Sequence, residues 1–445
     1  MSDGRQVRIE LPLYGGSFTT SDPDLTLPFV VPTELVGVQE NQPLHVLEPA
    51  PDRVVPQCPH FGACGGCQYQ HINDGAQVRM KGTILKRIME QAGLASLPRL
   101  MYCVAPRALG AALPTAGPFA YRNRIRLRIE QVEDTLRFGY NRRATTDFLP
   151  IVTCPISVPN LIPTVETLLS LRNTDKDAAH WLNSTAELEI FTSQDLARTQ
   201  LTFFVAPRTK VPQGSFTRFL NTLQRRVPQI AGAAAEAFDS RTGPTGRTLA
   251  THGASGLNYT VGDETYWVTR GAFFQVNRFL IDALVNLVTR DSSFRPRSGN
   301  IAWDLFAGVG LFSRVLVRNF AHVTAVEASP IASVDLAAAF KKFGPQHRAV
   351  AETTLGFLQK AIIQRERPEL IVLDPPRAGA GLEVCALLGR IAAPQIVYVS
   401  CDPTTLARDL RALQAERYKI AGVQLIDLFP QTFHIETVVT LIRET

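Results

Sequence analysis

Short apolar runs alternate with helical patterns in the last third of the chain. Four of these runs span residues 301–305, 323–327, 371–373 and 395–400. Continuous apolar runs of this length are typical of parallel strands that are covered on both faces. Strands that alternate with helices predict an α/β domain built on a parallel sheet, and we place this domain at residues 262–445.

Cys401 and Asp374 each directly follow one of these runs. The carboxyl ends of parallel strands share one edge of a sheet, where substrates bind in open α/β folds, so both side chains are expected at an active edge. Free cysteines commonly just pack in cores. Here, however, Asp402-Pro403 marks a strand that leaves the sheet and turns. We therefore predict that Cys401 is a nucleophile, because a thiolate suits soft electrophilic carbon.

The run that begins at residue 301 leads into a Gly-rich turn, Gly308-Val-Gly310. Glu327 ends the next run, 23 residues after Asp304 (327 − 304), where an acidic side chain can accept both hydroxyls of a ribose. The third glycine that lets a pyrophosphate approach is missing, which favours a nucleoside ligand without phosphates. S-adenosylmethionine (SAM) fits this pattern, and a simple packing turn is the alternative.

Three cysteines, Cys58, Cys64 and Cys67, lie within ten residues in the spacing Cys-x5-Cys-x2-Cys. Cys-x2-Cys lets two thiolates reach one metal centre, and the glycines between them let backbone amides approach the sulfurs. Cys154 is the best candidate for a fourth ligand, because Cys-Pro recurs at iron–sulfur sites. The spacing leaves both structural zinc and an iron–sulfur cluster open, with unligated thiols as the alternative. It excludes a radical SAM enzyme, which needs Cys-x3-Cys-x2-Cys.

Residues 1–56 are predicted to form a small β-barrel-like appendage. Strand-like segments at 7–13, 28–32 and 43–47 are separated by prolines and glycines. The segment holds three Arg and eight Asp or Glu, a net charge of −5 (3 − 8), which makes it a poor nucleic-acid binder on its own. Since the whole chain carries +6, the remainder carries +11, which suits a polyanionic partner.

A central α+β domain is predicted for residues 57–261. Its helical patterns lie at 75–94, 160–172 and 215–228, and its strand patterns at 121–129, 138–143, 186–192 and 199–205. Strict alternation in the 121–129 strand puts four arginines on one face, namely Arg122, Arg124, Arg126 and Arg128. Such a face suits phosphate contacts and base stacking, with a solvated sheet face as the alternative.

The chain as a whole has the composition of a cytoplasmic enzyme. Its 445 residues suffice for two or three domains, and seven cysteines at this length point to metal binding or catalysis rather than disulfides. No apolar run is long enough to span a bilayer, and the amino terminus is polar. We therefore expect a cytoplasmic monomer without a membrane partner.

Six ordered motifs together resemble the 5-methyluridine RNA methyltransferases, the group that includes the bacterial ribosomal and transfer-RNA uridine methylases. The motifs are CPHFGACGGCQYQH, FFQVN at 273–277, DLFAGVGLFS, DPPRAG, SCDPTTLARDL and FPQTFHIETVVTL. The resemblance covers roughly residues 56–156 and 262–445. It implies a Rossmann-like SAM-dependent methyltransferase domain at 262–445, a central iron–sulfur domain at 57–261, and a small appendage at 1–56. That appendage resembles a shortened, acidic version of the RNA-binding TRAM barrel of ribosomal members.

The resemblance also implies the site residues and the reaction. The implied assignments are a [4Fe-4S] cluster on Cys58, Cys64, Cys67 and Cys154, SAM contacts at Gln275, Phe306, Glu327 and Asp374, the nucleophile Cys401 and the general base Glu436. The implied reaction is methylation of carbon 5 of a uridine in RNA. We expect large-subunit (23S) ribosomal RNA as the substrate, with the T-loop uridine of tRNA as the alternative.

Three rival functions share part of this pattern. Amine methylases use Asn-Pro-Pro-Tyr and no cysteine, whereas this chain has Asp-Pro-Pro-Arg at 374–377 followed by Ser400-Cys401. Cytosine carbon-5 methylases use a similar thiol, but the cysteine motif and His434-Ile-Glu436 argue against them. A catalytically silent RNA-binding factor would not need nucleophile, base and donor site together.

Overall fold

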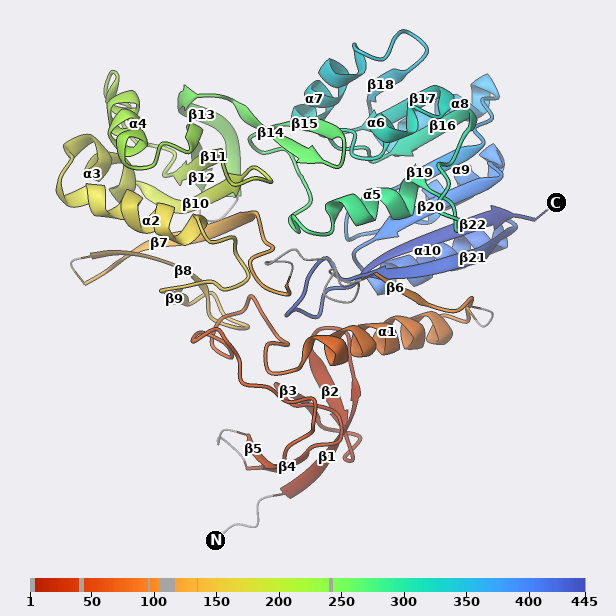
Figure 1. Cartoon of the computed structure of the whole chain (residues 1–445), viewed down its shortest axis with the longest axis horizontal. Helices are drawn as coiled ribbons and strands as arrows, with labels where there is room; N and C mark the ends of the chain where they lie inside the picture. Colours follow the sequence, from red (N-terminus) through yellow and green to blue (C-terminus); the bar gives the residue numbers. More distant parts are fainter. Residues whose placement is uncertain are drawn as a thin grey trace.

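The computed structural model describes residues 5–39, 44–94, 97–103, 117–133, 135–239 and 243–444. These residues form a five-stranded, a seven-stranded and an eight-stranded sheet, together with a two-stranded hairpin. Figure 1 shows the five-stranded sheet at the bottom, the seven-stranded sheet at the left and the eight-stranded sheet at the right. None of the helices in these ranges is both long and apolar enough to cross a membrane.

The five-stranded sheet is antiparallel and has the order β3-β2-β1-β4-β5. Its strands are β1 (Arg5–Pro12), β2 (Ser17–Thr20), β3 (Thr26–Pro28), β4 (Leu35–Val38) and β5 (His45–Glu48). The strand predicted at 28–32 is wrong: β3 ends at Pro28, and Phe29 and Thr33 adopt left-handed backbone angles (φ 59° and 77°) that break an extended run. Residue 43 of the segment predicted at 43–47 lies outside the described residues.

Helix α1 (Asp74–Gln91) joins the small sheet to the large one. Asn73 caps its first turn by accepting from the Ala76 amide, and Gly93 ends it in a left-handed conformation (φ 80°). Met80 packs against the small sheet, whereas Ile84, Leu85 and Met89 pack against the eight-stranded sheet. The short strand β6 (Met101–Cys103) then runs parallel to β21 (Tyr418–Ile426) at the edge of that sheet.

The seven-stranded sheet has the order β13-β12-β11-β10-β7-β8-β9. Its strands are β7 (Arg124–Val132), β8 (Thr135–Asn141), β9 (Phe148–Pro150), β10 (Thr185–Thr192), β11 (Thr199–Val205), β12 (Ile230–Asp239) and β13 (Gly243–Gly253). Helices α2 (Leu161–Ser170), η2 (Leu171–Asn173), α3 (Lys176–Asn183) and α4 (Ser215–Arg226) share one core with the apolar side chains of β7. The predicted alternation in β7 is confirmed, because Ile125, Leu127 and Ile129 are buried while the arginines lie on the other face.

The eight-stranded sheet has the order β18-β17-β16-β19-β20-β22-β21-β6. Its further strands are β16 (Gly299–Leu305), β17 (Phe320–Glu327), β18 (Arg348–Ala351), β19 (Leu370–Leu373), β20 (Gln395–Ser400) and β22 (Glu436–Arg443). Strands β16 to β20 pair in parallel, as the apolar runs predict, whereas β22 is antiparallel to β20 and β21.

Both faces of this sheet are covered, so it is doubly wound. Val372 faces a core shared with α5 (Ile281–Thr289), α6 (Ser313–Leu316) and α7 (Pro330–Phe340), and with the hairpin of β14 (Gly256–Val261) and β15 (Glu264–Thr269). Its neighbours Ile371 and Leu373 face α1, α8 (Thr354–Gln364), α9 (Leu382–Ile391) and α10 (Pro403–Ala415). Burial of alternate side chains in two cores explains why these strands are apolar throughout.

Candidate active site

The crevice of the eight-stranded sheet is set by its strand order. The chain passes from β16 outward through β17 to β18 and then returns to β19 on the other side of β16. In an open α/β sheet, ligands bind at the carboxyl ends of the strands where the order reverses. Phe306 follows β16 at this point, Glu327 ends β17, and Asp374 follows β19. Three of the four residues predicted to contact SAM therefore meet at the switch point.

The Gly-rich turn after β16 is held open by backbone geometry and by Glu327. Phe306, Gly308 and Gly310 have positive φ values of 64°, 57° and 88°, and a Cβ at Gly310 would lie 2.8 Å from Leu336. The Glu327 carboxylate accepts the Gly308 amide at 2.7 Å and the Ser329 amide at 2.6 Å. The shape of this turn therefore depends on glycines at positions 308 and 310, where φ is positive.

A cavity borders this turn. Phe306 lines a cavity of about 370 Å³ together with residues 353–355 and 379–384. The Asp374 amide donates to the Leu305 carbonyl at 3.3 Å, which fixes Asp374 next to Phe306. Oδ1 of the buried Asp304 has no hydrogen-bond partner among the described residues. Gln275 is 6 % exposed and comes from a different segment, where its carbonyl accepts the Asn123 side chain at 3.2 Å.

Two carboxyl groups at this crevice have raised pKa values. Burial raises the pKa of Asp304 to about 7, with the charge of Glu327 adding to the effect. Burial likewise raises the pKa of Asp374 to about 7, with the Asp304 charge as the second cause. Carboxyls shifted this far are typical of functional sites, and they favour a cationic ligand in the crevice.

Cys401 and Glu436 face each other across two paired strands. Ser400 of β20 lies opposite Thr437 of the antiparallel strand β22, so the next pair in the same register is Cys401 with Glu436. Cys401 is half-buried and Glu436 is 3 % exposed. The turn after Cys401 is fixed because Asp402 caps α10 by accepting the Thr404 and Thr405 amides at 2.9 and 3.0 Å. The structure thus brings together the predicted nucleophile and the predicted base.

The charges around this pair are coupled. Burial, then Glu436 and Asp374, raise the pKa of the Cys401 thiol to about 12, while Arg377 opposes the shift. Burial and Asp374 raise the pKa of Glu436 well above its ordinary value, and Arg377 again opposes. The thiol and the carboxyl therefore both hold protons in the free protein, and a cation bound near Asp374 would favour their release.

The loop that carries Glu436 is held by four residues from three distant segments. Lys81 donates to Asp427 at 2.6 Å and to the Phe429 carbonyl at 2.9 Å, and it is fully buried. The other anchors are Asn277 on the Leu428 carbonyl, Tyr121 on the Pro430 carbonyl, and Gln77 paired with Gln431 in both directions. Sequence reasoning missed these residues. The signal was Gln77 and Lys81, two polar residues on the buried face of a helix.

His434 lies in the same loop and is poorly suited to carry a positive charge. Its ring lies 4.4 Å from the Phe433 ring, and its Nδ1 atom is buried without a partner among the described residues. Burial and the charges of Arg377, Lys81 and Arg122 lower the pKa of His434 to about 4. A neutral imidazole at this place can accept or donate one hydrogen bond to a bound base.

The four cysteines predicted as ligands line one cavity of about 450 Å³, and Thr432, Phe433 and His434 line its other side. The Gly66 amide points at the Cys64 sulfur from 3.4 Å, and the Tyr140 hydroxyl lies 3.9 Å from the Cys154 sulfur. In the described part of the chain, no group of three or more His, Cys, Asp and Glu side chains is arranged to hold a metal ion. Cys103 and Cys385 lie outside the cavity.

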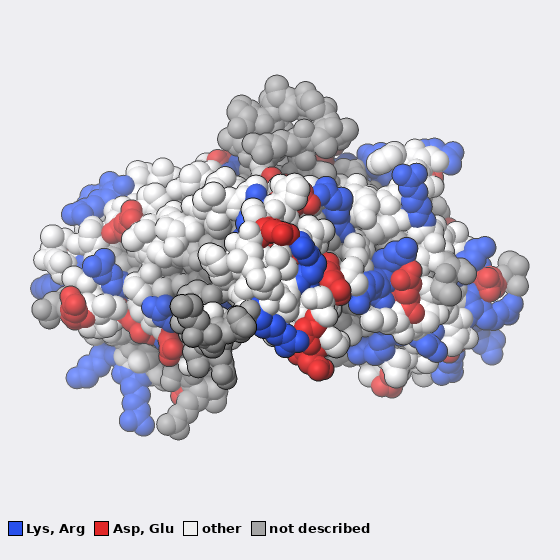
Figure 2. Space-filling model, turned by 90° about the horizontal axis from the view of Figure 1, so that it is seen from below, with Lys and Arg blue, Asp and Glu red and all other residues white. Residues whose placement is uncertain are grey.

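The arginine face of β7 is largely occupied by partners within the chain. The Arg124 guanidinium donates to the Ala272 carbonyl and stacks 4.1 Å from the Phe191 ring centre. Arg126 pairs with Glu187 and stacks on Phe204. Figure 2 shows Lys and Arg intermixed with Asp and Glu across the middle of the face that it displays. The prediction that this strand presents free arginines to phosphates therefore loses much of its support.

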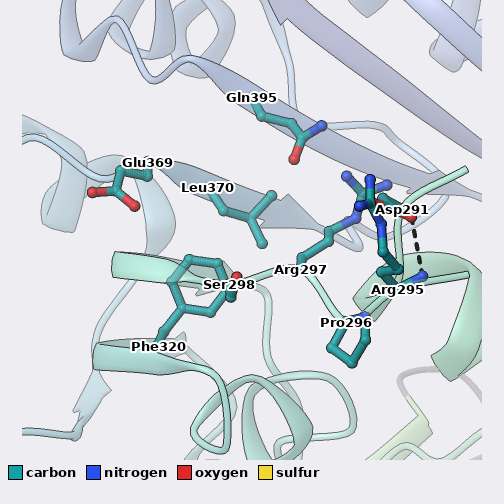
Figure 3. A pocket seen from close by; sticks show the side chains of 9 residues that line it. All are labelled: Asp291, Arg295, Pro296, Arg297, Ser298, Phe320, Glu369, Leu370 and Gln395. Atoms are coloured by element: carbon teal, nitrogen blue, oxygen red, sulfur yellow. Dashed lines mark hydrogen bonds and ion pairs between the residues drawn. The ribbon is translucent and has the colours of Figure 1, made fainter. Parts of the chain in front are cut away.

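A third cavity, of about 470 Å³, lies at the opposite edge of the sheet. Its lining includes Phe320, Leu370 and Gln395, which are the first residues of β17, β19 and β20. Figure 3 shows Asp291, Arg295 and Arg297 gathered at one end of this cavity and Glu369 at the other. Because it lies at the amino ends of the strands, it is separate from the crevice at the switch point.

Known proteins match both the carboxyl-terminal part of the chain and most of its length. Residues 354–444, which include Asp374, Cys401 and Glu436, match the family model for tRNA (uracil-5-)-methyltransferase. Uncharacterized RNA methyltransferases of Streptomyces coelicolor and Thermotoga maritima are each 29% identical, over 89% of this chain and over 81% and 87% of their own. The crystal structure of Pyrococcus abyssi tRNA (uracil-54, C5)-methyltransferase in complex with S-adenosyl-L-homocysteine shares the fold. Its TM-score is 0.73 at 20% identity, and the match covers 98% of this chain and 99% of that one.

Proposed function

As a member of the SAM-dependent RNA uracil-5-methyltransferase family, this chain is an RNA methyltransferase, and we propose that it methylates carbon 5 of a uridine through a covalent bond to Cys401. The observation that carries this proposal is the pairing of Cys401 with the buried Glu436 across β20 and β22. Methylation of carbon 5 by this route needs both a thiol and a base.

Carbon 5 of uracil is too weak a nucleophile to take a methyl group unaided. Addition of the Cys401 thiolate to carbon 6 forms a sulfur–carbon bond and moves the ring electrons to carbon 5 as an enolate. SAM, when bound, supplies the electrophilic methyl group that carbon 5 takes up. Glu436 then removes the proton from carbon 5, the carbon–sulfur bond breaks, and Cys401 leaves as the thiolate.

The chain's own residues prepare these steps by their charges. Glu436 must lose its proton to act as base, and its raised pKa keeps the pair protonated until the site is filled. We assign SAM contacts to Gln275, Phe306, Glu327 and Asp374, since three of them meet at the switch point and Asp374 favours a cation there. The target uridine must be swung out of its stack, which costs least when it already lies in a loop.

The cysteine cavity is assigned to a [4Fe-4S] cluster. Cys58, Cys64, Cys67 and Cys154 would hold it, and it would supply structural support beside the loop of Glu436. A single zinc ion needs all its thiolates about 2.3 Å from one point, whereas a cluster spreads its ligands over several irons. Four thiols that line one cavity are the ligand set that such a cluster needs. Visible absorption and iron analysis of anaerobically purified protein test this, and Cys64→Ser should remove the absorption. Stoichiometric zinc would overturn the assignment.

We assign the substrate to large-subunit (23S) ribosomal RNA, with the T-loop uridine of tRNA as the second candidate. The cysteine motif and chain length support the first. The experiment is tritium release from unmodified transcripts of each RNA labelled at carbon 5 of uridine, followed by mass-spectrometric mapping of the modified base. Release from ribosomal RNA alone is the expected result, and release from tRNA alone would select the second candidate. No release from either RNA would overturn uridine methylation in both.

A further inference from the structure

The tip of the small amino-terminal sheet reaches the active edge. Tyr14 lies in the turn between β1 and β2, and its hydroxyl donates to Oδ2 of Asp402 at 3.0 Å. Its ring also meets the Phe433 ring edge-on, with 5.4 Å between the ring centres. A Cβ at the neighbouring Gly16, where φ is +90°, would lie 3.6 Å from Phe433. Tyr14 thus contacts both the loop that carries Cys401 and the loop that carries Glu436.

Asp402 is the residue through which this contact can act on Cys401. Its Oδ1 atom caps α10, which leaves Oδ2 for Tyr14. The Ser400 hydroxyl donates to the Asp402 carbonyl at 3.0 Å and closes the turn around Cys401 from the other side. Helix α10 fixes one oxygen of Asp402 and the amino-terminal sheet fixes the other, so the backbone that presents the thiol is anchored on two sides.

The net charge of residues 1–56, which include the small sheet, argues against an RNA-binding role for this segment. Residues 1–56 carry a net charge of −5 (3 Arg − 8 Asp or Glu), which opposes binding to a polyanion. Tyr14 is half-buried, and both burial and Asp402 raise the pKa of its hydroxyl. The hydroxyl is therefore protonated at neutral pH and donates to Asp402.

We propose that Tyr14 is a positioning residue for Cys401, and that the amino-terminal sheet serves the reaction by completing the active edge instead of by binding RNA. The proposal rests on the proposed function, because it gives Tyr14 a part in thiol addition. It makes the separate prediction that the Cys401 thiol changes its reactivity in the free protein when the Tyr14 hydroxyl is removed.

The test compares Tyr14→Phe, which deletes only the hydroxyl, with wild type and with Ser21→Ala. Ser21 accepts the Arg8 amide within the same sheet, so its variant controls for loss of a hydroxyl there. Kinetics use the uridine-labelled transcript on which wild type is active. The second measurement needs no RNA: iodoacetamide modification of the Cys401 peptide is followed by mass spectrometry across pH.

In Tyr14→Phe, we expect kcat to fall about tenfold or more, as for a lost hydrogen bond to a charged group, with the KM for RNA unchanged. The rate–pH profile of Cys401 alkylation should also shift, while Ser21→Ala matches wild type in both. In an Asp402→Asn background, Tyr14→Phe should have little further effect, because Tyr14 acts through Asp402.

Two results would overturn the proposal. The first is an unchanged kcat and alkylation profile in Tyr14→Phe. The second is a raised KM or weaker RNA binding with kcat intact, which would make the sheet an RNA-binding element. If wild type itself released no tritium, the proposed function would fail, and the alkylation profile would still decide whether Tyr14 acts on Cys401.

Discussion

The two edges of the eight-stranded sheet are formed by the same strands, yet an ion pair is exposed to solvent at one edge and ionisable groups are buried at the other. At the amino edge, Arg295 is 77 % exposed and pairs with Asp291 at 3.4 Å, beside a cavity of about 470 Å³. At the carboxyl edge, burial raises the pKa values of Asp374, Glu436 and Cys401, and the charge of Asp374 adds to the rise at the other two groups.

The difference shows that the size of a cavity does not reveal at which edge of a sheet a reaction takes place. Solvent screens the charges at the amino edge, so a pair there contributes little. At the carboxyl edge the same kinds of group are desolvated, and their protonation states depend on what binds. Variants at the two edges should therefore differ by orders of magnitude in their effects.

The largest effect is expected for Cys401→Ala, which removes the atom that bonds to carbon 6. Tritium release should fall by on the order of 10⁴-fold or more. No covalent complex should form with RNA that contains 5-fluorouridine, as judged by denaturing gel. Cys103→Ala, a change at a cysteine outside the cysteine cavity, should retain activity. A complex that persists in Cys401→Ala would exclude this thiol as the nucleophile.

Glu436→Gln should slow turnover by roughly 10²–10⁴-fold, the usual contribution of a general base. Because thiol addition and methylation precede its step, the variant should accumulate a covalent RNA adduct that mass spectrometry detects. Wild-type turnover should rise with pH as Glu436, whose pKa is raised, and the Cys401 thiol lose their protons; in the variant the contribution of Glu436 to this rise should be lost, while that of Cys401 remains. A variant that turns over normally would assign proton removal to another group.

Lys81→Met tests the buried anchor of the Glu436 loop. Removing the ammonium leaves Asp427 uncompensated, so we expect a loss of about 3–5 kcal/mol in the free energy of unfolding by urea. The matched control is Lys86→Met on the same helix, whose pair with Glu90 is exposed and spans 3.6 Å. It should cost less than about 0.5 kcal/mol. Equal costs for the two variants would show that burial of the Lys81 pair contributes nothing.

Asp304→Asn should alter how stability depends on pH. The pKa of the folded Asp304 is about 7, against about 3.9 for an unfolded chain. Its proton therefore stabilises the fold at low pH, and this contribution is lost as pH rises through 7. Relative to wild type, the Tm of the variant should rise by a few degrees between pH 5 and pH 8. The control Asp263→Asn changes a side chain that is 92% exposed, and its Tm should depend on pH as that of wild type does.

The smallest effect is expected for Arg295→Ala at the amino edge. Its pair with Asp291 is exposed, so stability should change by less than about 0.5 kcal/mol and tritium release should not change. A fall of threefold or more in kcat would show that the two edges are coupled, and the contrast between them would then have to be abandoned.

The sequence predicted the catalytic edge because its signals are local. An apolar run followed at once by Cys401 or Asp374 determines both the strand and the end at which the side chain emerges. The helix predicted at 75–94 is observed at Asp74–Gln91, ended by the left-handed Gly93. Domain boundaries at 56 and 261 and the cluster on the cysteines remain proposals.

What the sequence could not predict depends on partners far along the chain. Gln77 and Lys81 break the apolar face of α1, and their burial makes sense only with Gln431 and Asp427, about 350 residues later. The arginines of β7 appeared free for RNA because Glu187 and the aromatic rings that engage them lie on other strands. The three-residue strand β6 carries no periodicity that could reveal it.

Strand β6 has a consequence for how the protein is made. It pairs with β21, so Cys103 must meet Ile426, which lies 323 positions later in the chain (426 − 103). At about 5–20 residues per second, a ribosome needs roughly 15–60 s to synthesise that stretch. Until β21 has been synthesised, β6 has no β21 to pair with, and the apolar residues of α1 that pack on the eight-stranded sheet are not fully covered. Strands β21 and β22, which are synthesised after the other strands of the eight-stranded sheet, thus complete that sheet.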